Sequence, residues 1–144
     1  MSPLETLIGP SLQDANHVNH PTSSILKNAK AIALYFSSSS CPPCRQFSHQ
    51  ILAPYLPNKD SEFEVVLVPF DWSAKDSQAY MKEVGMELAI PYHSELKQTL
   101  MEKYHVRGIP TVVVLDSQGT TLSQNARMEM MNDISGSVAR YVGK

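Results

Sequence analysis

Two short apolar runs stand out in the pattern of hydrophobic and polar positions along the chain. Residues 31–36 read Ala-Ile-Ala-Leu-Tyr-Phe, and residues 63–70 read Phe-Glu-Val-Val-Leu-Val-Pro-Phe. Runs of this length with almost no polar interruption are typical of strands that are buried on both faces of a sheet. We therefore expect two central strands in the interior of the fold.

Apolar residues at helical spacing predict four helices around these strands. The first follows residue 41, two more cover about residues 74–84 and 94–104, and the last is marked by apolar residues between 131 and 141. Helices that alternate with buried strands are expected to cover the faces of a sheet.

A β-branched run over residues 111–115, joined by a turn to residues 120–123, predicts an antiparallel hairpin. Strands and helices thus alternate before a hairpin closes the sheet, so the expected class is α/β, with a central mixed β-sheet flanked by helices. The 144 residues fit a single domain. Within it we expect an irregular N-terminal extension over residues 1–28 and a core over residues 29–144.

The composition argues against several classes of function. The chain is 42% hydrophobic and 18% charged, with a formal net charge of −2. A dedicated nucleic-acid binder is usually strongly basic, and no run approaches the roughly 18 apolar residues that a membrane span requires. Residues 1–13 lack the basic stretch and apolar core of a secretory signal. We expect a cytoplasmic monomer that binds neither nucleic acid nor membrane.

The chain has two cysteines, Cys41 and Cys44, and they lie three positions apart. In a reducing compartment such a pair is more often catalytic or metal-binding than structural. A zinc site needs about four ligands, and only His17 and His20 could supply the others, by folding the N-terminal segment over the cysteines. We therefore expect no metal and no other cofactor, and a redox-active cysteine pair.

The pair lies in the segment Cys41-Pro42-Pro43-Cys44-Arg45, where a buried strand gives way to a helix. Proline is favoured in the first helical turn. The unpaired N–H groups and positive end of the helix dipole stabilise a thiolate at Cys41, and Arg45 adds a positive charge nearby. Cys44 falls in register with the apolar stripe and so faces the core. We therefore expect Cys41 to be the nucleophile and Cys44 the resolving thiol.

A second motif, Ile109-Pro110-Thr111, directly precedes the run at 111–115, where proline need not donate to a sheet. The two motifs together resemble the thioredoxin superfamily, and within it the tryparedoxin and nucleoredoxin branch. The resemblance covers about residues 25–128 and includes Tyr35-Phe36-Ser37, the run at 63–68, Phe70-Asp71, Ile90-Pro91-Tyr92 and Asn125-Ala126-Arg127.

The resemblance implies a thioredoxin fold, thiol–disulfide oxidoreductase activity, and a cis Ile109–Pro110 bond that faces Cys41. In the family, the backbone beside this proline pairs with an extended segment of the partner. The implied partners are protein or low-molecular-weight disulfides and dithiols. The resemblance allows a peroxiredoxin-type client, and it allows a reductant of either the trypanothione or the glutathione type.

The chain departs from the branch at positions that help to bind trypanothione. Ser40 replaces a tryptophan, Phe70-Asp71-Trp72 replaces Trp-Asp-Glu, and Glu129 stands near the place of a second arginine. Trp72 is a candidate for the aromatic surface that Ser40 lacks. Arg127 is a candidate contact for an acidic group of a cosubstrate, with a solvated arginine as the alternative. The resemblance therefore implies dithiol chemistry and leaves this reductant open.

Tyr35 stands where thioredoxins proper carry a buried acid, as the tryparedoxin branch would have it. The proton that Cys44 must lose then passes either to water or to Asp71. Two functions follow from the sequence. The first is a dithiol oxidoreductase that acts through a mixed disulfide at Cys41, and the alternative is a thioredoxin-fold interaction module with little or no redox turnover.

Overall fold

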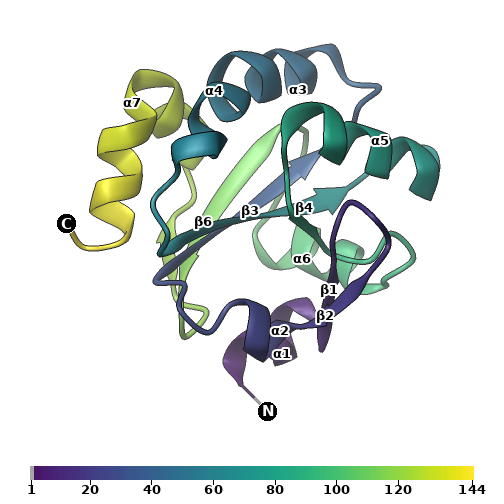
Figure 1. The fold of residues 1–144 in the computed structure, drawn as a ribbon, viewed down its shortest axis with the longest axis horizontal. Coiled ribbons are helices and arrows are strands. Elements are labelled where there is room, and N and C mark those ends of the chain that lie inside the picture. The colour runs from purple at the N-terminus through teal and green to yellow at the C-terminus, as the bar shows by residue number, and fades with distance from the viewer. Residues whose placement is uncertain (1) are drawn as a thin grey trace.

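The two apolar runs form the centre of the sheet, as predicted. β3 (Ala31–Ser37) and β4 (Phe63–Pro69) pair in parallel, with Ala31 opposite Phe63. The computed structural model, which describes residues 2–144, places them in a seven-stranded sheet of order β2-β1-β5-β4-β3-β6-β7 (Figure 1). Parallel and antiparallel pairs occur together, so the predicted α/β class with a mixed sheet is confirmed.

The predicted hairpin is also present. β6 (Thr111–Asp116) lies antiparallel to β3 and continues through a turn into β7 (Thr121–Ser123). On the other side of the centre, β5 (Leu88–Ala89) runs parallel to β4. β5 is not predicted from the sequence, because two residues are too few to show a period.

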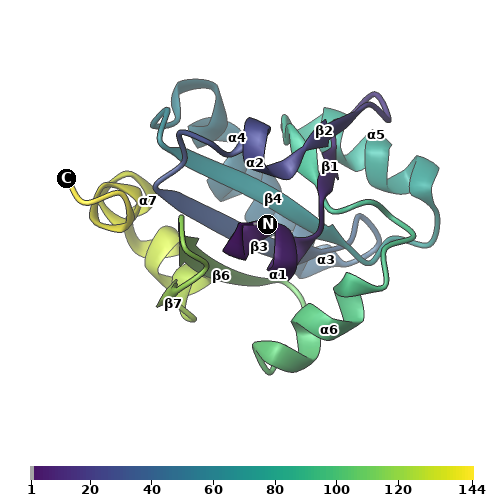
Figure 2. The same cartoon turned by 90° about the horizontal axis from the view of Figure 1, so that it is seen from below.

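Side chains of β3 alternate between two hydrophobic layers. Ala33 and Tyr35 belong to one layer, and Leu34 and Phe36 to the other. The helices that cover the first layer are α3 (Pro42–Phe47), α5 (Ala74–Val84) and α7 (Ala126–Tyr141), and those that cover the second are α1 (Pro3–Ile8) and α6 (Leu96–Lys103). Figure 2 shows α5 and α6 on opposite sides of the sheet. No helix among residues 2–144 is long and apolar enough to cross a bilayer.

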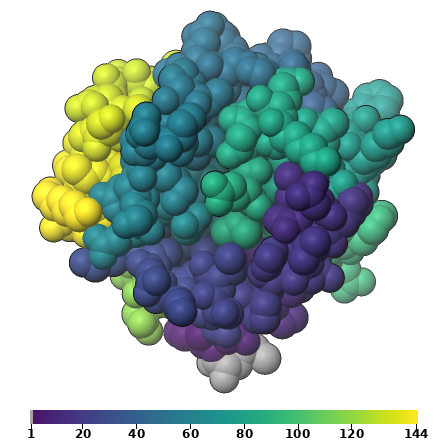
Figure 3. Space-filling model, viewed as in Figure 1, coloured from purple at the N-terminus to yellow at the C-terminus, as the bar shows by residue number. Residues whose placement is uncertain are grey.

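The N-terminal segment differs from the irregular layer that we predicted. After α1 it forms β1 (Ser11–Gln13), β2 (Asn19–Pro21) and α2 (Thr22–Ile25). β1 pairs antiparallel with β5 and extends the sheet, and its Leu12 is fully buried. Figure 3 shows this segment, in purple, in contact with the rest of the molecule. Pairing of β1 with β2 and with the edge strand β5 therefore orders a polar sequence that has little strand signal of its own.

The helix after the cysteines is continuous in space but not uniform. A π-helical turn (Ser48–Leu52) follows α3, and α4 (Ala53–Tyr55) and a 3₁₀ turn (Leu56–Asn58) complete it. Pro54 lacks an N–H, so the carbonyl group one α-turn before it has no regular donor, which favours a wider turn. The sequence correctly predicted a helix here but not its change of pitch.

The candidate site residues lie at one end of the central strands. Parallel β3 and β4 both end there, and the antiparallel β6 begins there with Thr111 opposite Phe36. The loop of residues 38–40, the N-terminus of α3 and the Ile109–Pro110 segment are consequently neighbours.

Candidate functional site

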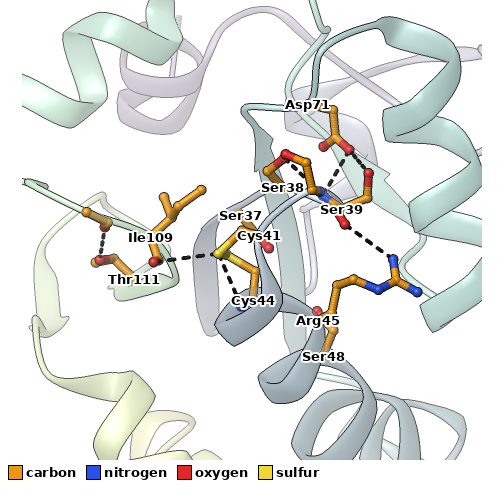
Figure 4. The surroundings of a disulfide bond; sticks show 12 residues. Ser37, Ser38, Ser39, Cys41, Cys44, Arg45, Ser48, Asp71, Ile109 and Thr111 are labelled. Atoms are coloured by element: carbon orange, nitrogen blue, oxygen red, sulfur yellow. Dashed lines mark hydrogen bonds between the residues drawn. A yellow bond between two sulfur atoms is a disulfide. The ribbon is translucent and has the colours of Figure 1, made fainter.

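Cys41 and Cys44 form a disulfide at the start of α3, with their Cα atoms 5.2 Å apart. Cys41 is the N-cap residue, and its Sγ accepts a hydrogen bond from the backbone N–H of Cys44 at 3.3 Å (Figure 4). Pro42 and Pro43 occupy the first two helical positions and are exposed. The helix end thus directs a backbone donor at the sulfur of Cys41, as a thiolate in the reduced protein would require.

The two sulfur-bearing residues differ in accessibility. Cys44 is fully buried with Phe47 one turn further along, whereas Cys41 is half-buried at the tip. The Sγ of Cys41 lies 3.8 Å from the carbonyl oxygen of Ile109. The Ile109–Pro110 peptide bond is cis, and Pro110 is buried. Figure 4 shows Ile109 facing Cys41 from the side opposite α3.

A chain of buried hydroxyl groups supports α3 from below. The hydroxyl of Tyr35 donates to the carbonyl oxygen of Cys44 at 3.1 Å and lies 2.7 Å from Ser48 Oγ. Ser48 Oγ lies 2.6 Å from the hydroxyl of Tyr80, which lies 3.0 Å from Ser37 Oγ. Burial, with Tyr80 close by, raises the pKa of Tyr35 far above its usual value. Tyr35 is therefore a neutral donor and not a base that could accept the proton of Cys44.

Asp71 approaches the cysteine loop from the end of β4. Its Oδ2 accepts hydrogen bonds from the N–H of Ser39, at 2.9 Å, and from the hydroxyl of Ser39. Figure 4 shows the Asp71 carboxylate turned toward Ser39. Asp71 thus contacts the segment that leads into Cys41.

Arg45 contacts the same loop from the helix side. Its Nη1 donates to the carbonyl oxygen of Ser39 at 3.4 Å, and its Nη2 lies 2.5 Å from Oε2 of Glu83 on α5. His49 Nε2 lies 2.7 Å from the same Glu83 oxygen. Burial acts to raise the pKa of Glu83, but the His49 hydrogen bond and the Arg45 charge outweigh it and lower that pKa. Arg45 therefore tethers α3 to α5 as well as to the loop.

Three predicted site residues form no hydrogen bond or ion pair to the cysteines among residues 2–144. Ser40 is exposed, and its side chain and N–H form hydrogen bonds within residues 2–144 only to Ser38 of its own loop. Trp72 is 85% exposed, the most open large apolar side chain that the structure describes. Arg127 is half-buried at the start of α7, and its Nε has no hydrogen-bond partner among residues 2–144. Within that range, no hydrogen bond or ion pair joins Trp72 or Arg127 to the cysteines.

In the described part of the chain, no three His, Cys, Asp or Glu side chains are grouped so that they could hold an ion. His20, one of the two histidines considered for zinc, instead lies 2.9 Å from Asp14 in the β1–β2 hairpin.

Sequence reasoning missed four residues around the cysteines, namely Ser39, Ser48, Tyr80 and Glu83. Ser39 had a usable signal, because residues that follow neighbouring parallel strands meet at one edge of the sheet. Ser48 and Tyr80 had none, since an isolated serine or tyrosine in a helix gives no sign of its partner. Glu83 lies 38 residues from Arg45, beyond any local pairing rule.

Comparison of the sequence with known proteins identifies related proteins. A family model described as "Thioredoxin-like" matches residues 28–121. Nucleoredoxin of Mus musculus is 34% identical over 132 residues, which cover 90% of this chain but only 29% of the relative. The chain thus spans less than a third of that protein.

Solved structures are similar over nearly the whole chain. Thioredoxin from Wuchereria bancrofti superposes with a TM-score of 0.78 and 34% identity, covering 93% of this chain and 97% of that one. Tryparedoxin II complexed with glutathionylspermidine gives a TM-score of 0.80 and 27% identity, covering 94% and 95%. The protein has a thioredoxin fold and belongs to the thioredoxin superfamily, in its tryparedoxin- and nucleoredoxin-like branch, an oxidoreductase family, with Cys41 and Cys44 as its cysteine pair.

Proposed function

We propose that this protein is a thiol–disulfide oxidoreductase in which Cys41 attacks and Cys44 resolves. The observation that carries the proposal is the asymmetry of the pair. Cys41 is accessible, and its sulfur accepts a hydrogen bond from the backbone N–H of Cys44. The side chain of Cys44, in contrast, is fully buried. A thiolate at Cys41 can meet a partner, while Cys44 can reach only the sulfur of Cys41 in the mixed disulfide.

The reaction requires two exchanges. The Cys41 thiolate attacks one sulfur of a substrate disulfide, forms a mixed disulfide and releases the other substrate sulfur as a thiolate. Cys44 then loses its proton, which water carries to a released substrate thiolate, and attacks Cys41 Sγ. This attack forms the Cys41–Cys44 disulfide and releases the second substrate thiolate. The substrate gains two electrons, the protein loses two, and an external dithiol reverses both steps to reduce the protein again.

The surroundings of Cys41 support an extended partner. The Ile109 carbonyl lies beside the nucleophile, where a backbone N–H of the partner could pair with it. A low-molecular-weight dithiol is the proposed reductant. The complex of the similar tryparedoxin II with glutathionylspermidine supports a thiol of the glutathione–polyamine class, although the exposed Ser40 offers it no aromatic surface.

Turnover of insulin disulfides with dithiothreitol as electron source tests the proposal. Wild-type protein should reduce insulin faster than dithiothreitol alone, and Cys41→Ser should abolish the gain. Ser135→Ala, a substitution on the exposed surface of α7, serves as a control and should leave the rate unchanged. A wild-type rate equal to that of dithiothreitol alone would instead favour the interaction module.

A further inference from the structure

The N–H, the carbonyl oxygen and the hydroxyl of Ser39 all form hydrogen bonds. Its N–H and hydroxyl donate to Asp71, and its carbonyl oxygen accepts from Arg45. Ser39 precedes Cys41 by two residues, and no regular element holds the loop between them. The adjoining Ser38 carbonyl accepts the N–H of Cys41 at 3.2 Å. The position of Cys41 thus depends on a short loop whose anchors are side chains from other elements.

Asp71 is the more rigid of the two anchors. It is only 5% exposed, and its own carbonyl oxygen accepts the hydroxyl of Tyr92 at 2.5 Å. Tyr92 lies in turn under Lys97, whose Nζ is 4.2 Å from the ring centre and donates to the carbonyl of Pro69 at 3.1 Å. Burial lowers the pKa of Lys97, and the charge of Asp71 opposes that shift. Segments that follow three neighbouring parallel strands are therefore linked through Asp71.

The Arg45 anchor is weaker. Its bond to Ser39 is 3.4 Å long, and the guanidinium is partly exposed and shared with Glu83. Exposed pairs of this kind contribute little and exchange readily with water. Asp71 also accepts two hydrogen bonds from Ser39 on a single oxygen, whereas Arg45 donates only one to Ser39.

We infer that Asp71 is a positioning residue for the nucleophile, which it places against Ile109 and the helix end by holding Ser39. The inference rests on the proposed function and adds a role to a residue that touches neither sulfur. The other carboxylate oxygen of Asp71, Oδ1, is buried with no hydrogen-bond partner among residues 2–144. Burying a carboxylate costs free energy, and within that range the bonds to Ser39 are the side-chain hydrogen bonds that offset this cost. Misplacing a reacting group by about 1 Å can cost up to about 100-fold in rate, so an effect on turnover is expected.

Four single variants and one double variant, Asp71→Ala/Ser39→Ala, test the inference. Asp71→Ala removes both bonds to Ser39, Asp71→Asn keeps one acceptor, and Ser39→Ala removes only the hydroxyl bond. Asp116→Ala is the matched control, because Asp116 Oδ1 also accepts two donors, the N–H groups of Gln118 and Thr120, in the turn at the opposite end of β6. The readouts are kcat/KM for a small disulfide and for insulin, and hydrogen exchange at the amides of residues 39, 41 and 44.

Asp71→Ala should lower kcat/KM about 10-fold for both substrates alike, because the defect lies in the nucleophile and not in partner binding. Exchange should accelerate at all three amides, while Asp116→Ala changes neither readout at the site. Adding Ser39→Ala to Asp71→Ala should cause no further loss, since the hydroxyl acts through Asp71. If Asp71→Ala does not fold, Asp71→Asn and Ser39→Ala decide by the same measurements, with smaller losses.

The inference is overturned if Asp71→Ala matches Asp116→Ala in both readouts, or if the losses of Asp71→Ala and Ser39→Ala simply add. It is also overturned if only insulin turnover falls, because that would place Asp71 in partner binding. Hydrogen exchange requires no turnover, so an inactive wild-type protein would refute the proposed function while the exchange data still tested the role of Asp71.

Discussion

The buried hydroxyl chain under α3 makes a quantitative prediction. Each hydroxyl carries one proton, so donation by Tyr35 to the Cys44 carbonyl orders the whole chain in one direction, from Ser37 through Tyr80 and Ser48 to Tyr35. Ser48 is the central member, and it is fully buried. Its hydroxyl keeps one partner when either tyrosine is changed to phenylalanine and loses both in the double variant.

The expected losses follow from the number of bonds. Each tyrosine makes two contacts in the chain, and a buried hydrogen bond contributes about 0.5–1.5 kcal/mol, so each single variant should lose about 1–3 kcal/mol. In Tyr35→Phe/Tyr80→Phe the Ser48 hydroxyl also lacks a partner in the chain, which adds about 1 kcal/mol or more beyond the sum of the single losses. For a chain of this size, 1 kcal/mol corresponds to about 4 °C in Tm.

Urea unfolding of the oxidised proteins, followed by far-ultraviolet circular dichroism, measures the cycle. Tyr104→Phe is the matched control, because the Tyr104 hydroxyl is buried without a hydrogen-bond partner in residues 2–144. Its removal should be neutral or stabilising. Strictly additive single losses, or losses no larger than that of Tyr104→Phe, would refute the view that the four hydroxyls act as one network.

Two further predictions concern the rim of the site and α7. Ser40→Trp should raise kcat/KM for a trypanothione-type dithiol several-fold, since each Å² of apolar surface buried is worth about 25 cal/mol, and equal gains with dithiothreitol in steady-state assays would contradict this. Tyr141→Phe removes a 2.6 Å hydrogen bond to Glu129 and should cost about 1–2 kcal/mol in urea unfolding at pH 7. That bond lowers the pKa of Glu129, so its contribution is present above the unfolded pKa of about 4.5 and is lost as the pH falls through the lower folded value. A difference between wild type and Tyr141→Phe that persisted at the acid end of this range would argue against the assignment.

The sequence was most informative where elements are long and apolar. The runs that form β3 and β4 have a single charged position, Glu64, because both faces of the sheet are covered, and helix α5 is predicted at residues 74–84, where it occurs. The junction at Cys41 was predictable as well, because two prolines between a buried strand and a stripe of apolar residues at helical spacing suit a first helical turn.

Features set by distant partners were not predictable. Three-residue strands such as β1 show no period, and β1 is held by its pairing with β2 and with β5. Asp71 was singled out from the family pattern, but its contact with Ser39 needs the strand pairing to be known. Glu129 stands near the place of an arginine in the family pattern, whereas in the fold its carboxylate accepts hydrogen bonds from the hydroxyls of Ser123 and Tyr141. Side-chain networks of this kind are determined by packing rather than by local sequence.

The most direct test of the central claim is to find which cysteine reacts first. Reduced wild-type protein is treated near neutral pH with less than one equivalent of iodoacetamide, and tandem mass spectrometry locates the label. Because Cys41 is accessible and receives the helix N–H while Cys44 is buried, the label should appear on Cys41. Faster labelling of Cys44 would contradict the assignment of nucleophile and resolving thiol.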